Sequence, residues 1–208
     1  RLVGSEMCIR DRVCEMSTRQ VTAIDRDGEL VVLADRYEDR RLNSPNDLWV
    51  DPRGGIYFSD PRYGSTADVE LEGQHVYYLS PDRSTLTQVT DDLVQPNGII
   101  GTPDGSRLYV ADHGAGRVWA YQIDTDGTLT DKRVFVSQGS DGLTMDDRGN
   151  IYLTGQDVTV FNPAGEAIAS IGVPEPPANV TFGGIDGTTL FIAARTSLYR
   201  VSMLVTGQ

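Results

Sequence analysis

A segment of fifteen or sixteen residues recurs four times along this chain, and it constrains the fold more than any other feature. Each copy opens on Asn or Asp, carries a glycine eight residues later, and has an aromatic residue after that glycine. The copies are NDLWVDPRGGIYFSD from Asn46, NGIIGTPDGSRLYVAD from Asn97, DGLTMDDRGNIYLTG from Asp141 and NVTFGGIDGTTLFIAA from Asn179. Each copy predicts two strands joined by a Pro/Asp/Gly turn, which is a hairpin.

Two further strand-like runs follow each of the first three copies, for example HVYYLS and LTQVT after the first. Each repeat therefore contains four short antiparallel strands. The copies start 51, 44 and 38 residues apart, close to the roughly 40 to 50 residues of a propeller blade. A β-sandwich would also have many short strands, but it would not repeat the same residue class at the start of each strand pair. The sequence thus predicts an all-β protein, a β-propeller.

The two ends of the repeat array are incomplete in this pattern. Residues 13–35 supply the later strands of one more blade, and the fourth copy ends soon after SLYRVSM without an outer strand. We therefore expect a partial propeller domain over residues 13–208, with about four and a half blades. The first twelve residues, RLVGSEMCIRDR, show neither strand alternation nor a helical period. They resemble a translated linker, and we expect residues 1–12 to be a non-native or disordered leader; a poorly ordered natural terminus is the alternative.

Charge and composition exclude several classes of protein. The chain has 18 Lys and Arg against 30 Asp and Glu, a net charge of -12, which is the wrong sign for neutralising phosphates, so we expect no nucleic acid partner. No apolar run approaches the roughly 18 residues of a membrane helix, so we expect no membrane association. Cys8 and Cys14 lie too close together to crosslink the domain. The oligomeric state and the compartment have no clear signal, although the cytoplasm is favoured.

The first residue of each repeat is the main candidate for function. The innermost strands of a propeller line its central channel with the same end at the same mouth, so the side chains of Asn46, Asn97 and Asp141 should converge. Two amide oxygens and one carboxylate suit a hard divalent cation. Asp60 and Asp112, at the outgoing ends of the second strands, should reach the same mouth, and Asn179 is the equivalent position of the fourth copy.

A second interpretation is purely structural, because Asn, Asp and Gly are common turn residues. The matching positions of these residues in successive repeats favour a cation site over the purely structural interpretation. The chain has only two histidines, His75 and His113, so a histidine-based zinc site or catalytic triad is not expected. His113, directly after Asp112, is a candidate substrate contact or proton carrier.

Several motifs also carry a family resemblance. RLNSPNDLWVDPRGGIYFSDPRYG, DDLVQPNGI, SDGLTMDDRGNIY and LFIAARTSLYRV occur in this order. Together they resemble the gluconolactonase/regucalcin (senescence marker protein) family of six-bladed propellers. The resemblance implies one divalent cation in the channel, held by Asn46, Asn97 and Asp141 and by a glutamate that has no counterpart here and would lie before Val13. Ca²⁺ is the expected ion, with Zn²⁺, Mg²⁺ or Mn²⁺ as alternatives. Where the family has a CEH-like stretch, this chain reads Cys14-Glu15-Met16.

The resemblance further implies the hydrolysis of a sugar lactone, resembling gluconolactone, to its aldonic acid. Asp141 is the expected catalytic carboxylate as well as a ligand, and the expected substrate contacts are Asp47, Asp60, Tyr63 and His113. Two alternatives stay open: a non-catalytic propeller that binds a cation or another ligand, and a promiscuous hydrolase of esters or phosphotriesters.

Overall fold

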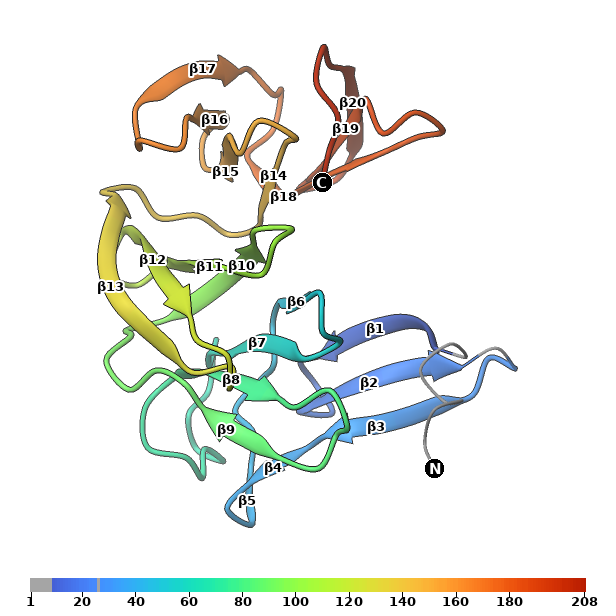
Figure 1. The fold of residues 1–208 in the computed structure, drawn as a ribbon, viewed down its shortest axis with the longest axis vertical. Helices are drawn as coiled ribbons and strands as arrows, with labels where there is room; N and C mark the ends of the chain where they lie inside the picture. Colours follow the sequence, from blue (N-terminus) through green and yellow to red (C-terminus); the bar gives the residue numbers. More distant parts are fainter. Residues whose placement is uncertain (1–8, 26) are drawn as a thin grey trace.

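The computed structural model describes residues 9–25 and 27–208 and consists of strands and turns throughout that part of the chain. Five small antiparallel sheets follow one another along an arc in chain order (Figure 1). Within each sheet the strands are also ordered as in the sequence. This arrangement is a β-propeller, and the predicted fold is confirmed.

The three middle sheets have four strands each. The second sheet contains β6 (Leu48–Val50), β7 (Ile56–Asp60), β8 (His75–Leu79) and β9 (Leu86–Gln88). The third contains β10 (Pro96–Gly101), β11 (Arg107–Asp112), β12 (Arg117–Ile123) and β13 (Leu129–Val136). The fourth contains β14 (Leu143–Met145), β15 (Ile151–Thr154), β16 (Val158–Phe161) and β17 (Ala167–Ile171).

The first and last sheets have three strands. The last contains β18 (Pro177–Gly183), β19 (Thr189–Ala194) and β20 (Leu198–Ser202), and the first contains β1 (Ile9–Glu15), β2 (Gln20–Asp25) and β3 (Leu30–Ala34). A small hairpin of β4 (Arg36–Tyr37) and β5 (Arg40–Arg41) connects the first sheet to the second. The sequence pattern did not predict this hairpin.

The structure differs from the expected boundary at residue 12. Strand β1 begins at Ile9, and residues 9–15 pair with β2 up to Glu15 opposite Gln20. Residues 9–12 therefore belong to the first sheet, because backbone pairing forms this strand without an alternating side-chain pattern. The rest of the expected leader, residues 1–8, lies outside the described residues.

The four repeat copies form the predicted hairpins. They are β6–β7, β10–β11, β14–β15 and β18–β19, all antiparallel. The repeated glycine of each copy lies in the turn with a positive φ: 93° at Gly54, 69° at Gly105, 76° at Gly149 and 70° at Gly187. Residues with a Cβ rarely adopt this conformation, which explains the period of the glycine.

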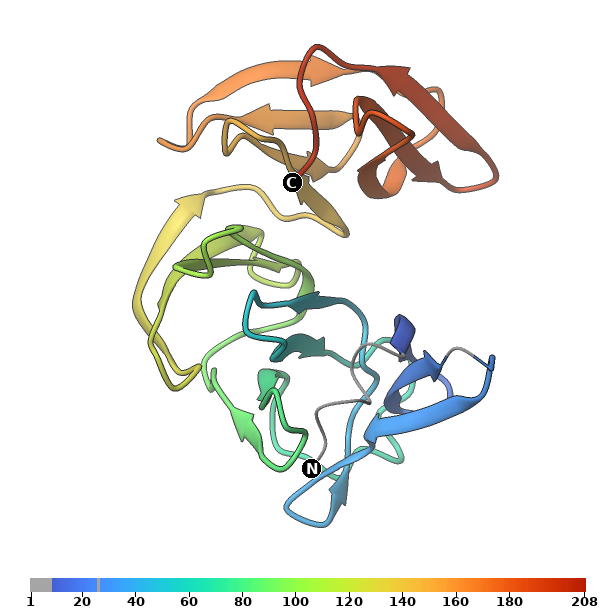
Figure 2. The same cartoon turned by 45° about the vertical axis from the view of Figure 1, so that its right-hand side comes forward.

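The hydrophobic core lies between the sheets. Four buried clusters fill the four spaces between consecutive sheets; for example, Tyr57 and Val76 of the second sheet pack with Ile99 and Leu108 of the third. The inner strands β6, β10, β14 and β18 contact one another along the concave side of the arc (Figures 1 and 2). No helix in the described part of the chain has the length and apolar character needed to cross a membrane.

Candidate active site

Two backbone hydrogen bonds join the beginnings of neighbouring inner strands. The amide of Gly98 donates to the carbonyl of Asp141 over 2.9 Å, and the amide of Gly142 donates to the carbonyl of Ala178 over 2.8 Å. A Cβ on Gly98 would lie 2.3 Å from the Asp141 carbonyl oxygen, so only glycine permits this approach. Asn97 and Asp141 therefore lie at the beginnings of two neighbouring, hydrogen-bonded inner strands.

Asp47 makes the corresponding link between β6 and β10. Its Oδ2 accepts a hydrogen bond from the amide of Ile99 over 3.0 Å, and its Oδ1 accepts one from Leu48 over 2.9 Å. Burial, opposed by these two bonds, raises the pKa of Asp47 to about 6, and the charge of Asp141 adds to the rise. Asn46, which directly precedes Asp47, is thereby placed beside the beginning of β10.

The structure thus brings the three predicted cation ligands to the beginnings of three adjacent inner strands. Asn97 is 5% exposed, Asn46 is half-buried and Asp141 is exposed. The Nδ2 of Asn97 donates to the Tyr63 hydroxyl over 2.6 Å, which leaves Oδ1 as the free end of that amide. Among the described residues, neither the Asn46 amide nor the Asp141 carboxylate makes a side-chain hydrogen bond or an ion pair.

This donor set fits a hard cation. Free carboxylate and amide oxygens are the ligands that Ca²⁺ and Mg²⁺ prefer. Within residues 9–25 and 27–208, no group of three His, Cys, Asp or Glu side chains could hold a metal ion. The set predicted here has a different composition, since two of its three members are amides.

Tyr63 lies over Asn97 on the segment that joins β7 to β8. Burial raises the pKa of Tyr63, the hydrogen bond from Asn97 opposes that rise, and the charges of Asp141 and Asp112 add to it. The hydroxyl therefore keeps its proton at neutral pH. Tyr63 is thus a neutral hydroxyl close to two of the predicted ligands.

Asp60 and Asp112 have a structural role that the sequence did not indicate. The two Asp60 oxygens accept the amides of Ser44 and Asn43 over 2.6 and 2.7 Å. Asp112 accepts those of Gln95 and Val94 over 2.8 and 3.1 Å. Each carboxylate thus fastens the segment that enters the inner strand of its own sheet. Only the matching position of the two aspartates in the repeat pointed to a shared role.

Two other positions singled out by the sequence, His113 and Asn179, do not share the geometry of the three predicted ligands. The His113 side chain is exposed, and its backbone amide donates to Gln95 over 3.0 Å. In the fourth copy, the carbonyl of Ala178 accepts a hydrogen bond from the amide of Gly142, just as the carbonyl of Asp141 accepts one from the amide of Gly98. The Oδ1 of Asn179 instead accepts the backbone amide of Val180. The expected equivalence of Asn179 was therefore wrong by one residue, and Ala178 provides no side-chain oxygen.

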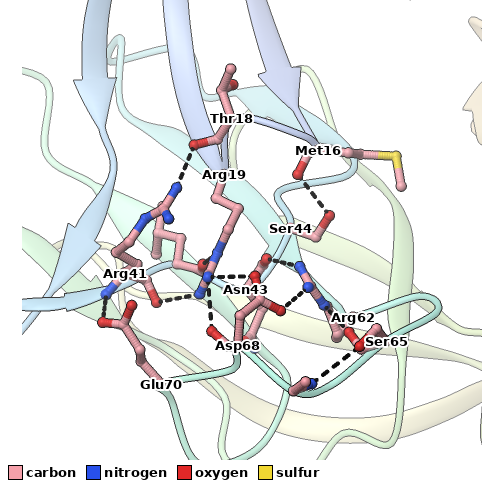
Figure 3. Close-up of polar contacts among 12 residues, drawn as sticks. Met16, Thr18, Arg19, Arg41, Asn43, Ser44, Arg62, Ser65, Asp68 and Glu70 are labelled. Atoms are coloured by element: carbon pink, nitrogen blue, oxygen red, sulfur yellow. Dashed lines mark hydrogen bonds and ion pairs between the residues drawn. The ribbon is translucent and has the colours of Figure 1, made fainter.

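Sequence reasoning missed two features close to the site. Burial raises the pKa of the free Cys14 thiol, and the charges of Asp47 and Asp60 raise it further. Arg19, whose side chain is 3% exposed, and Arg62 both pair with Asp68, which is 56% exposed (Figure 3). Arg62 and Asp68 lie on the same segment between β7 and β8 as Tyr63. No local sequence pattern marks Arg19, because its partners Leu42 and Asp68 are 23 and 49 residues away in the chain.

Comparisons with known proteins agree with this architecture. A gluconolactonase from Zymomonas mobilis is 33% identical over 210 residues, which cover 91% of this chain and 59% of that relative. The pentonolactonase XacC of Haloferax volcanii is 28% identical to this chain, and the match covers 68% of the length of that relative. The solved structure of a gluconolactonase from Xanthomonas campestris superposes with a TM-score of 0.84 at 34% identity, over 95% of this chain and 68% of that one. This chain therefore spans only about three-fifths of the length of the first relative.

The family model described as the SMP-30/gluconolactonase/LRE-like region matches residues 7–196. That match includes all four hairpins and every predicted site residue. The chain belongs to the SMP-30/gluconolactonase/LRE-like family.

Proposed function

We propose that this chain carries the site of a divalent-cation-dependent lactonase that opens a sugar lactone, resembling gluconolactone, to its aldonic acid. Membership of a family with named lactonases supports lactone hydrolysis. The observation that supports the proposal is the position of Asn46, Asn97 and Asp141 at the starts of three adjacent inner strands. Nearby Asp47 adds negative charge, and within the described residues neither Asp47 nor Asp141 forms an ion pair.

Asn46, Asn97 and Asp141 would hold the cation, with Ca²⁺ favoured over Zn²⁺, Mg²⁺ and Mn²⁺. When bound, the cation would polarise the lactone carbonyl and stabilise the negative charge that develops on its oxygen. The Asp141 carboxylate, which is exposed, would accept a proton from the attacking water. The water oxygen bonds to the carbonyl carbon, the bond between that carbon and the ring oxygen breaks, and the ring oxygen leaves as a hydroxyl after taking up the proton that Asp141 accepted from the water.

The remaining predicted residues differ in how far the structure supports substrate contact. The neutral Tyr63 hydroxyl and the exposed His113 can donate hydrogen bonds to sugar hydroxyls, and Asp47 lies beside Asn46. Both Asp60 oxygens already accept backbone amides. We therefore leave Asp60 out of the proposed substrate contacts.

The test is proton release from glucono-1,5-lactone, followed in a pH-stat with and without chelator. Chelation should reduce the release to the rate of spontaneous hydrolysis measured without protein, and added Ca²⁺ should restore the protein-dependent rate. Asp141→Asn keeps the shape and one oxygen but removes the basicity, so kcat should fall by about 10² or more. Asp147→Asn is the matched control, because Asp147 is an exposed aspartate in the turn at the other end of β14, and it should retain full turnover.

The outcomes separate the alternatives. Cation binding without turnover on any aldonolactone would favour a non-catalytic binding propeller. Turnover restricted to a phosphotriester or aryl-ester panel would indicate a different hydrolase. If excess Ca²⁺ rescues Asp141→Asn, Asp141 is a ligand and not the base.

A further inference from the structure

The boundaries between neighbouring sheets use the same two faces again and again. Successive residues of a strand point to opposite faces of its sheet. One face carries the repeated aromatic residue and packs on the next sheet, and the other packs on the preceding sheet. The aromatic residues of the second, third and fourth sheets are all buried in this way: Tyr57, Tyr109 and Tyr152. We call the face toward the next sheet the forward face and the other the rear face.

The last sheet leaves its forward face open. Phe191 takes the place of the three tyrosines there and is only half-buried. The contrast is larger one position along the strands, where Ala193 of β19 lies opposite Leu198 of β20. Leu198 is 70% exposed. The equivalent residues of the three preceding sheets are valines with no exposed surface: Val76, Val118 and Val158.

The first sheet leaves its rear face open. Val13 of β1, opposite Thr22, occupies the place that Phe58 has opposite Tyr77 in the second sheet. Val13 is exposed, whereas the residues at this place in the four later sheets are buried: Phe58, Val110, Leu153 and Ile192. Strand β3 adds Leu30 and Val32 to the same face, and these are 63% and 51% exposed. The first sheet thus offers an apolar surface of the kind that receives a preceding sheet.

The two open faces carry opposite charges. Arg200 lies opposite Phe191 on the forward face of the last sheet and is exposed. Asp11 lies opposite Ile24 on the rear face of the first sheet and is also exposed. Complementary charges favour contact between a forward and a rear face over contact between two faces of the same kind.

We propose that the forward face of the last sheet in one molecule docks on the rear face of the first sheet in a second molecule of this chain. Each molecule carries both halves of a sheet-to-sheet contact that already occurs four times within it. The first and last sheets lie at opposite ends of the arc (Figures 1 and 2). A pair of molecules therefore keeps one open face of each kind, and association continues to larger assemblies. This inference goes beyond the proposed lactonase activity and does not depend on it.

Sedimentation velocity of the full chain at increasing protein concentration tests the contact. We expect the average mass to rise with concentration. Leu198→Asp alters the forward face and Leu30→Asp the rear face, and each should raise the Kd for association about tenfold or more. Ile168→Asp is the matched control, because Ile168 is an exposed residue on the outer strand of the fourth sheet, which is covered on both faces. It should associate as the unaltered chain does.

A mixture of the two variants gives the sharpest result. Leu198→Asp keeps an intact rear face and Leu30→Asp keeps an intact forward face. Each variant alone should stay a monomer, whereas the mixture should form pairs with one molecule of each and should not grow further. Such pairs would also show that both variants are folded.

A monomer mass for the unaltered chain at every concentration would overturn the proposal and leave the two faces to another occupant. Undiminished association of either variant by itself would overturn it as well, because the molecules would then meet through like faces or through another surface.

Discussion

At the scale of single residues, the buried carboxylates Asp47 and Asp60 set how stability responds to pH. Asp60 is fully buried, and burial raises its pKa to about 6, although the amides of Asn43 and Ser44 oppose the rise. The pKa of Asp47 is raised to about 6 as well. Both groups therefore bind a proton more tightly in the folded chain than in the unfolded chain, whose ordinary value is 3.8.

The sign of the pH effect follows from this difference. The stability that these two groups contribute is fully present below about pH 4 and is lost as the pH rises through about 6. We expect the Tm in the presence of chelator to be higher at pH 5 than at pH 7, by roughly 5 °C. Thermal unfolding followed by circular dichroism measures this change.

Carbon-detected NMR of the carboxyl groups provides the direct check, with titration midpoints near pH 6 for both residues. In Asp60→Asn one of the two groups is gone, so the rise in Tm between pH 7 and pH 5 should shrink. Midpoints at or below pH 4, or a Tm that does not change over this range, would contradict the expectation.

These residues also show what the sequence could and could not predict at this scale. The repeat places Asp60 and Asp112 at equivalent positions, but it does not tell whether a carboxylate faces the channel or its own backbone. That choice depends on amides 16 to 18 residues earlier in the chain, which become neighbours only after folding. Asn97 and Asp141 were predictable because their place at the strand start follows from the hairpin period.

At the scale of elements, the contact between β10 and β14 depends on a glycine. Gly98→Ala would place a Cβ 2.3 Å from the Asp141 carbonyl oxygen, and a backbone atom cannot rotate away as a side chain can. We expect a loss of about 1 to 3 kcal/mol in the free energy of unfolding, the usual cost of overpacking. Urea denaturation at equilibrium measures it.

Gly172→Ala is the matched control for this substitution. A Cβ on Gly172 would meet no atom within 4 Å, so its effect should stay within about 0.5 kcal/mol. The same urea midpoint for Gly98→Ala and Gly172→Ala would show that the inner strands tolerate a wider separation than the structure indicates.

The hairpins were the most predictable elements, because each combines alternating apolar residues with a turn glycine. The fourth copy shows where that pattern fails. Counting eight residues back from Gly187 gives Asn179, but the buried face of β18 includes Val180 and Phe182 packs beside it. The face that a residue presents depends on the register with the preceding sheet, which no local pattern records. The sequence does not predict the β4–β5 hairpin either, because its short, Arg-rich strands show no alternation of apolar and polar residues.

At the scale of the whole molecule, the sheets in the described part of the chain are separate, and no continuous hydrogen-bonded ladder joins one to the next. Four apolar clusters hold neighbouring sheets together, and a few polar bonds link their inner strands. The three proposed cation ligands come from three different sheets, the second, third and fourth. A bound cation would therefore join three sheets at one point, and its binding energy would add to the stability of the arrangement.

This linkage predicts how the whole chain melts. A ligand that binds only the folded state stabilises it by about 2.7 kcal/mol at a concentration 100 times its Kd. For a chain of this length that gain raises Tm by roughly 5 to 10 °C. Scanning calorimetry with saturating Ca²⁺ and with chelator should show this difference for the unaltered chain. In Asn97→Ala, which removes one ligand but not the sheet that carries it, most of the difference should disappear. An undiminished Ca²⁺ effect in Asn97→Ala would place the stabilising cation elsewhere on the molecule.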